Sequence, residues 1–154
     1  MDTGITVFFK DTIDFLDSFE EIFEKNYCED VICIDCSHNK KLKTLPDLSS
    51  FVRLKRLCCN NCSLTSLPHL SNINLCYINC SNNSIEELPY LNLPNLSVLK
   101  CNDNLLMELP KSLKELPKLQ TLECSNNFLL NLANFSDFKI EKFICHANPT
   151  TQRL

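Results

Sequence analysis

One nine-residue phrase, repeated six times, constrains this chain more than any other feature. Its clearest copy is LSVLKCNDN at residues 96–104, and its general form is L-x-x-L-x-C-x-x-N. Successive copies begin 23, 21, 21, 23 and 21 residues apart. They occupy residues 31–39, 54–62, 75–83, 96–104, 119–127 and 140–148. A repeat of this length indicates a solenoid, in which each copy forms one coil that buries its apolar edge only against neighbouring coils.

The repeat predicts a direction for most of its side chains. Because side chains alternate along a strand, positions four and six share one side and positions three and five share the other. Positions one, four and six are occupied by Leu, Ile, Val, Phe or Cys in every copy. We therefore expect these three positions to face the core.

Position nine is Asn in every copy except the second, where it is Cys62. An inward-facing amide that lacks hydrogen bonds costs about 1–3 kcal/mol, so these side chains need partners. We predict that each Asn bonds backbone groups left open at a sharp bend, and that the stacked copies form a ladder serving adjacent coils. Cys62 would form a weaker rung of the same ladder.

The 154-residue chain contains a single glycine, Gly4. Its turns must therefore be built from Asn, Asp, Ser and Pro, and Asn and Asp tolerate left-handed backbone while bonding local amides. Glycine-rich phosphate-binding loops are excluded by the same shortage. Apolar residues make up 44% of the chain, which is enough for the core of one domain.

Residues 1–30 lie outside the repeat and are predicted to form an N-terminal cap. Residues 5–9, ITVFF, are typical of a short strand or an apolar lead-in. From Asp11 onwards, apolar residues recur at three- and four-residue steps between acidic residues, which predicts an amphipathic helix. Such a helix would cover the open end of the solenoid; the alternative is a docking helix for a partner. Residues 31–154 are predicted to be the repeat domain, with its last copy truncated.

Charge is spread unevenly along the chain. Residues 1–30 carry a net charge of −7 and the remaining residues a net charge of +3, which together give −4. An acidic N-terminal segment followed by a nearly neutral repeat region does not favour nucleic-acid binding. No apolar run approaches the roughly 18–20 residues that span a bilayer, and the N-terminus lacks the pattern of a secretory signal. We therefore expect neither a nucleic-acid nor a membrane partner.

Eleven cysteines would suggest a secreted disulfide scaffold if their spacing were ignored. Position six is Cys in all six copies, however, and stacked in-register thiols rarely have disulfide geometry. We predict a row of buried, reduced thiols and a cytoplasmic location, with Cys58 and Cys76 as exposed thiols on or near the sheet. The pair Cys33 and Cys36 is not predicted to bind zinc, because the two side chains point to opposite sides of one strand. Cys59 and Cys62 would both face the interior but belong to separate ladders, so zinc is not predicted there either. We expect no metal and no cofactor.

The phrase L-x-x-L-x-C-x-x-N, followed by x-L-x-x-L-P, resembles the leucine-rich repeat family over residues 31–148. The resemblance implies an α/β-class, mainly β solenoid: a curved right-handed coil with short parallel strands on its concave face and a helical N-terminal cap. For this short period it implies extended segments rather than full helices on the convex side. It also implies a non-enzymatic module that binds a protein through the concave face. Short repeat proteins of large DNA viruses and intracellular bacteria have a similar composition.

Positions three and five project from the predicted concave face and are the candidates for partner binding. Tyr77, with Arg56 and Lys100 on either side, is the most anchor-like cluster, because Tyr and Arg are enriched in binding hot spots. The same positions would equally suit an ordinary solvated surface. The candidate residues are Asp35, Arg56, Cys58, Tyr77, Asn79, Val98, Lys100, Thr121 and Glu123.

The sequence leaves several biological roles open. One is a viral or pathogen-type modulator of host proteins, located in the host cytoplasm if viral. Others are a substrate-recruiting adaptor for a ubiquitin ligase and the targeting part of an effector whose catalytic domain lies elsewhere. A further alternative is a structural protein that forms homodimers through its C-terminal edge, because an unpaired parallel strand near Phe143 would recruit another strand.

Overall fold

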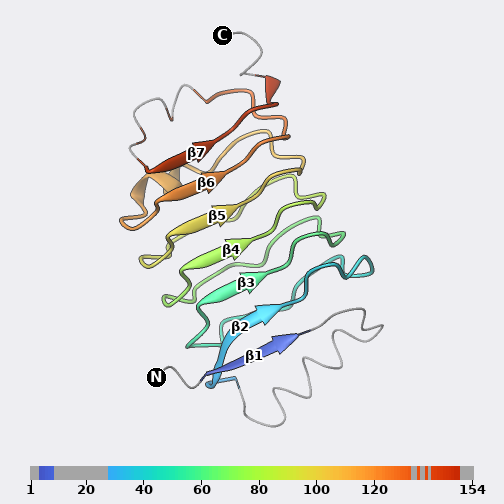
Figure 1. Ribbon diagram of the computed structural model, residues 1–154, viewed down its shortest axis with the longest axis vertical. Helices are drawn as coiled ribbons and strands as arrows, with labels where there is room; N and C mark the ends of the chain where they lie inside the picture. The colour runs from blue at the N-terminus through green and yellow to red at the C-terminus, as the bar shows by residue number, and fades with distance from the viewer. Residues whose placement is uncertain (1–3, 9–27, 133–134, 136–137, 139, 150–154) are drawn as a thin grey trace.

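The computed structural model of the chain describes residues 4–8, 28–132, 135, 138 and 140–149. Within these residues, seven short strands pair in parallel and in chain order to form a single sheet (Figure 1). The strands are β1 (Ile5–Phe8), β2 (Val31–Asp35), β3 (Arg56–Cys58), β4 (Tyr77–Asn79), β5 (Val98–Lys100), β6 (Thr121–Glu123) and β7 (Lys142–Ile144). The predicted parallel-strand solenoid is confirmed, and each of the six repeats supplies one strand, from β2 to β7.

The first strand, β1, comes from outside the repeat. In its parallel pairing with β2, Val7 lies opposite Ile34 and Phe8 opposite Asp35. Val7 is partly buried against the core, so β1 extends the sheet and its core by one layer. The amphipathic helix predicted to begin near Asp11 falls on residues 9–27, which lie outside the described residues.

The strand register decides which side chains are buried. Position four is completely buried in β2 to β6, as with Ile34 and Leu99, whereas position three is half-buried or exposed in every repeat. The cysteines at position six form the predicted row beneath the sheet, and the row ends at the half-buried Cys145. All eleven cysteines of the chain lie within the described residues, and all are free thiols.

The return limbs on the other side of the solenoid are extended, as the short repeat implies. The return limb of the fourth repeat contains η1, a 3-10 helix at Lys111–Glu115. The 23-residue length of this repeat leaves room for an extra tight turn. The hydroxyl of Ser112 in this helix accepts a 3.1 Å hydrogen bond from the Leu91 N–H, which ties the helix to the preceding coil.

Four of the five asparagines at position nine form the predicted ladder; Asn39 is the exception, because its buried Nδ2 has no hydrogen-bond partner. The Nδ2 of Asn104 donates to the backbone oxygens of Cys80, Cys101 and Asn102 at 3.1, 3.2 and 3.1 Å. Its Oδ1 accepts a hydrogen bond from the Ile85 N–H at 3.0 Å. Cys80 and Ile85 belong to the preceding coil, so one side chain both closes its own bend and holds the coil before it. The same pattern recurs at Asn83, Asn127 and Asn148.

Position eight, directly before the ladder, has a left-handed backbone in all six copies, with φ between 53° and 67°. The residues are His38, Asn61, Asn82, Asp103, Asn126 and Ala147. Glycine usually fills such positions because it has no Cβ, and Asn, Asp and His are the usual substitutes. Asn or Asp therefore fills four of the six bends, as the composition predicts, and His38 fills a fifth. Ala147 is the exception, because its methyl group offers no local hydrogen bond to offset the strain.

Cys62 replaces Asn on the second rung, and an extra residue in the first coil explains why this is tolerated. In later coils the N–H two residues after position nine, such as that of Leu64, depends on the Asn Oδ1 of the next coil. The first coil has a longer bend, and the equivalent N–H, that of Leu42, donates to the Asn39 backbone oxygen at 3.1 Å instead. The second coil therefore needs no acceptor at position nine, and the Cys62 thiol donates to the Cys36 backbone oxygen at 3.2 Å.

Substitution of Asn104 tests the ladder. Asn104→Ala should lower the free energy of unfolding by about 2–4 kcal/mol, because it leaves the buried Ile85 N–H unpaired and removes a donor shared by three carbonyls. Urea unfolding followed by circular dichroism measures the change. Asn92→Ala, at an exposed return-limb position, is the control and should change stability by less than about 0.5 kcal/mol. Equal losses in the two variants would contradict the ladder's role.

Substitution of Ala147 tests the strain at position eight. Ala147→Gly should raise the free energy of unfolding by about 0.5–1 kcal/mol, because glycine adopts a left-handed backbone without a Cβ clash. The reciprocal change, Asn82→Ala, should lower stability by a comparable amount. Calorimetric Tm values for both variants measure the effect, and a lower Tm for Ala147→Gly would show that Ala147 is not strained.

Candidate functional site

The nine candidate residues all lie on one surface of the sheet, here called the sheet face. It consists of the outward residues of β1 to β7. At position three these are Thr6, Cys33, Arg56, Tyr77, Val98, Thr121 and Lys142, and at position five Phe8, Asp35, Cys58, Asn79, Lys100, Glu123 and Ile144. Every candidate residue except Glu123 is half-buried or exposed, so the sheet face presents a continuous strip of accessible side chains.

Arg56 and Tyr77 form a stacked pair on this face. The two residues lie directly opposite each other in β3 and β4, and the Arg56 Cζ is 4.1 Å from the Tyr77 ring centroid. At this distance the guanidinium makes a cation–π interaction with the ring. The predicted neighbourhood of Arg56 and Tyr77 is therefore present, and the contact orders both side chains before any partner arrives, which reduces the entropy lost on binding.

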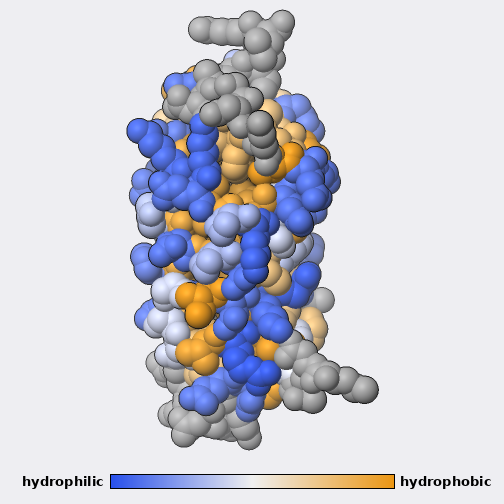
Figure 2. Space-filling model, turned by 90° about the vertical axis from the view of Figure 1, so that its left-hand side faces the viewer, coloured by the Kyte–Doolittle hydropathy of each residue, from blue (hydrophilic) through white to orange (hydrophobic). Residues whose placement is uncertain are grey.

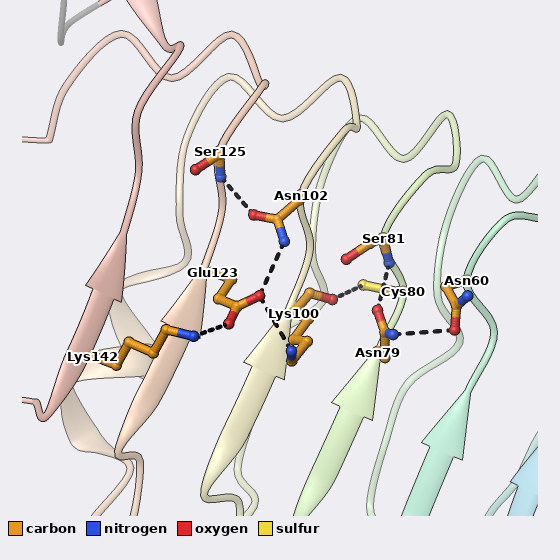
Figure 3. Close-up of polar contacts among 9 residues, drawn as sticks. All are labelled: Asn60, Asn79, Cys80, Ser81, Lys100, Asn102, Glu123, Ser125 and Lys142. Atoms are coloured by element: carbon orange, nitrogen blue, oxygen red, sulfur yellow. Dashed lines mark hydrogen bonds and ion pairs between the residues drawn. The ribbon is translucent and has the colours of Figure 1, made fainter.

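Lys100, the third member of the predicted cluster, belongs to a separate charged group around Glu123 (Figure 3). The Glu123 carboxylate lies 3.3 Å from Lys100 Nζ and 2.7 Å from Lys142 Nζ, and Asn102 Nδ2 donates to it at 3.3 Å. These contacts, with the Lys142 hydrogen bond foremost, lower the pKa of Glu123 below its ordinary value. Glu123 is only 9% exposed, so a partner would meet the two lysines rather than the carboxylate.

A row of polar side chains continues the sheet face beyond the strand ends (Figure 3). Asn79 Nδ2 donates to Asn60 Oδ1 at 3.1 Å, and the Ser81 N–H donates to Asn79 Oδ1 at 3.2 Å. Two coils further on, the Ser125 N–H donates to Asn102 Oδ1 at 2.9 Å. The amide of the candidate residue Asn79 is thus engaged at both ends, which fixes its orientation on the surface.

Two thiols meet near the N-terminal end of the sheet face. Cys33 and Cys58 are diagonal neighbours on β2 and β3, and both are half-buried. A hydrogen bond with the Cys58 thiol, helped by the nearby Arg56 guanidinium, lowers the pKa of Cys33 to about 7 against the opposing effects of burial and Asp35. The same contact raises the pKa of Cys58, which keeps its proton. Sequence reasoning identified Cys58 as an accessible thiol, but the pairing with Cys33 depends on how two coils stack.

Phe8 is a sheet-face residue that sequence reasoning missed. It is 62% exposed and lies opposite Asp35. Residues 1–30 were assigned to a cap, so their side chains were not counted with those of the repeats. The available signal was the alternation within residues 5–8, which places Phe8 and Thr6 on the opposite side of the strand from Val7.

The described residues contain no group of three or more His, Cys, Asp and Glu side chains suited to a metal ion. Cys33 and Cys36 lie as the strand period predicts, with Cys33 half-buried on the sheet face and Cys36 buried in the core. Across the described part of the chain, no helix has the length and apolar character needed to cross a membrane.

Known proteins match this chain in structure only. No protein-family model matches the sequence, and no curated protein matches it significantly. The functional domain of InlJ from Listeria monocytogenes, described as including a cysteine ladder, matches 77% of this chain with a TM-score of 0.65 and 31% identity. YopM from Yersinia enterocolitica matches 79% with a TM-score of 0.61 and 26% identity. The Toll–Spatzle complex from Drosophila matches 80% with a TM-score of 0.58 and 22% identity, and so shares the fold.

These structures are much longer than this chain, which spans 26% of the InlJ chain, 30% of the YopM chain and 21% of the chain from the Toll–Spatzle complex. The row of thiols at position six corresponds to the kind of feature named for the InlJ domain. With the repeated phrase, the parallel strands and the asparagine ladder, these matches show that the chain has the leucine-rich repeat fold.

The pairing of Cys33 with Cys58 predicts an unusually reactive thiol. The rate of Cys33 alkylation by iodoacetamide should reach half its maximum near pH 7, below the value of about 8.5 expected for an ordinary thiol. Cys58→Ser and Arg56→Gln should each move this midpoint upward, because each removes an interaction that favours the thiolate. Peptide mapping by mass spectrometry across a pH series measures the rate, and a midpoint that neither substitution moves would contradict the assignment.

Proposed function

We propose that this chain is a non-enzymatic protein-binding module that binds its partner through the sheet face. The observation that carries the proposal is the stacked pair of Arg56 and Tyr77, with a 4.1 Å separation between the Cζ atom and the ring centroid. Both residue types are enriched in binding hot spots, and this pair is already ordered. The leucine-rich repeat fold supports the same conclusion, because its structural neighbours indicate an interaction module.

The separation between structural and variable positions of the repeat supports a binding role for this face. The core and the bends are built from positions one, four, six, eight and nine, which leaves positions three and five free to vary. Their side chains differ from coil to coil, whereas the buried positions are nearly uniform. Such a surface can be specific for one partner without any change in the scaffold.

The charge and shape of the sheet face indicate what the partner must offer. Tyr77 provides a half-buried aromatic surface, so an apolar or aromatic group of the partner would pack beside it. Lys100 and Lys142 surround one carboxylate, which leaves them with an excess positive charge. An acidic group on the partner would therefore complement the strip between β5 and β7.

We further propose that the protein works in a reducing compartment such as the cytoplasm. Support comes from the eleven free thiols, including the pair Cys33 and Cys58 on the binding face. Two of the matching structures are bacterial proteins, which supports a pathogen-type modulator of host proteins as the setting. The partner in that case would be a host protein.

A comparison of two tyrosine variants tests the sheet-face proposal. Tyr77→Ala should weaken capture of the native partner by about 2 kcal/mol, roughly thirtyfold in Kd, because it removes the anchor and releases Arg56. Tyr90→Ala is the matched control, since Tyr90 is 61% exposed on a return limb. Affinity purification from the native cell, followed by titration of the recovered partner, measures both effects. Recovery of the same partners by both variants with equal affinity would refute the proposal.

A further inference from the structure

Four large apolar side chains stand exposed on the flank where the strands end, away from the sheet face. They belong to the bends that follow β5 and β6, on the arrowhead side of the strands in Figure 1. Leu105 is 39% exposed, Met107 64%, Phe128 52% and Leu130 66%. These four residues are here called the strand-end patch.

The patch is one continuous surface because the two coils are paired through their backbones. Leu105 and Phe128 occupy position ten of the fourth and fifth repeats, and Met107 and Leu130 occupy position twelve. The Phe128 N–H donates to the Leu106 backbone oxygen at 2.9 Å, and the Leu130 N–H donates to the Met107 oxygen at 3.1 Å. Equivalent side chains of adjacent coils therefore lie side by side, about 4.8 Å apart along the stack.

The fold does not require apolar residues at these positions. The intervening residues Leu106 and Leu129 point inward and are buried. In the second repeat the equivalent positions are Ser63 and Thr65, and in the third they are Ser84 and Glu86. Those coils have the same strand pairing and the same bend. The four apolar side chains of the patch are therefore not needed to form the core. Exposed apolar clusters of this kind mark interaction sites.

Acidic side chains border the patch. Glu86 and Glu87 are exposed on the neighbouring third coil, and Glu108 is exposed directly after Met107. None of these three carboxylates forms an ion pair with another described residue. The basic residues of the same flank, Lys40, Lys41 and Lys43, lie in the first coil, with the neutral second coil between them and the acidic group.

This charge pattern argues against a second copy of the chain as the occupant. A twofold dimer that joined patch to patch would bring the two Glu108 side chains and their acidic neighbours together, which is unfavourable. The chain as a whole also carries a net charge of −4. A basic partner has no such penalty, and its Lys or Arg side chains would neutralise the rim while its apolar groups cover the patch.

We propose that the strand-end patch binds an amphipathic, basic segment of a partner protein, as a second binding surface distinct from the sheet face. The spacing of the patch fits such a segment. Equivalent side chains of its two coils are about 4.8 Å apart, and the side chains at positions ten and twelve of one coil are about 6.6 Å apart. Apolar side chains at i and i+4 of a helix lie about 5–6 Å apart, and two of them match these dimensions. Lysines flanking that apolar pair would reach the rim formed by Glu86, Glu87 and Glu108.

Binding of a designed peptide to the full chain tests the proposal. The probe is a fluorescent amphipathic helical peptide with Leu on one face and Lys on the other, and its counterpart has Glu in place of Lys. Fluorescence anisotropy should show binding of the Lys peptide that weakens as salt increases, and no binding of the Glu peptide. Equal binding of the two peptides would overturn the proposal.

Variants of the chain locate the binding site. Met107→Gln/Leu130→Gln and Glu86→Lys/Glu87→Lys should each weaken binding of the Lys peptide by about tenfold or more. Val52→Gln/Ile73→Gln is the matched control, because these apolar residues are 53% and 61% exposed but precede the strands. The flank where the strands begin is the one facing the viewer in Figure 2, where apolar groups are interspersed with polar ones. An equal loss in this control would show non-specific adsorption and overturn the proposal.

Two further measurements separate this proposal from its alternatives. Tyr77→Ala should leave peptide binding unchanged, so a failure of the sheet-face proposal does not affect this one. Sedimentation across a concentration series should show that Met107→Gln/Leu130→Gln has the same oligomeric state as the unmodified chain. A dimer that this variant dissociates would assign the patch to self-association and overturn the proposal. Thermal unfolding confirms that each variant remains folded.

Discussion

The asparagine ladder at the bends of the third to sixth coils is the interaction on which the rest of this solenoid depends. The amide of Asn104 closes its own turn through the Cys101 and Asn102 carbonyls and reaches back to Cys80 and Ile85 in the previous coil. Each such side chain therefore sets both the direction of the chain after the strand and the spacing between coils. The left-handed residue at position eight turns the backbone so that this amide points inward. Because these contacts repeat from the third coil to the sixth, each coil is held by its immediate neighbours and no longer-range element is needed.

The second coil shows how the need for a hydrogen-bond acceptor at position nine depends on the length of the preceding bend. Cys62 has no strong acceptor to replace the Asn oxygen, and it is found where the longer first bend already satisfies the Leu42 N–H through Asn39. A change in loop length in one coil thus permits a change of residue type in the next. The cysteine row beside the ladder follows similar logic, since a thiol is small enough for the tight inner corner and can donate weakly to a carbonyl, as Cys80 does to Lys100 at 3.4 Å.

The inward positions maintain the scaffold, so the outward positions are free to vary and could bind partners. On the sheet face, Arg56 and Tyr77 form an ordered aromatic and cationic pair, and Lys100 and Lys142 surround a shielded Glu123. On the strand-end flank the same scaffold carries basic, neutral, acidic and finally apolar side chains from the first coil to the fifth. These two surfaces differ in chemistry and face different directions. The pair of surfaces would allow two partners, or two parts of one partner, to bind the chain at once.

The repeat in the sequence determined the parallel strands, the buried positions, the cysteine row, the asparagine ladder and the neighbourhood of Arg56 and Tyr77. It could do so because equivalent positions of adjacent coils stack on one another, so each of these features follows from a residue's position in the repeat. The tertiary structure alone decided features that depend on contacts across coils. Among these are the addition of β1 with its exposed Phe8, the shielding of Glu123 by two lysines, the contact between Cys33 and Cys58, and the exposure of Leu105 beside Phe128. The physical reason is that these features depend on side-chain conformation, on diagonal contacts between non-equivalent positions, or on a strand outside the repeat, and the repeat pattern specifies none of these.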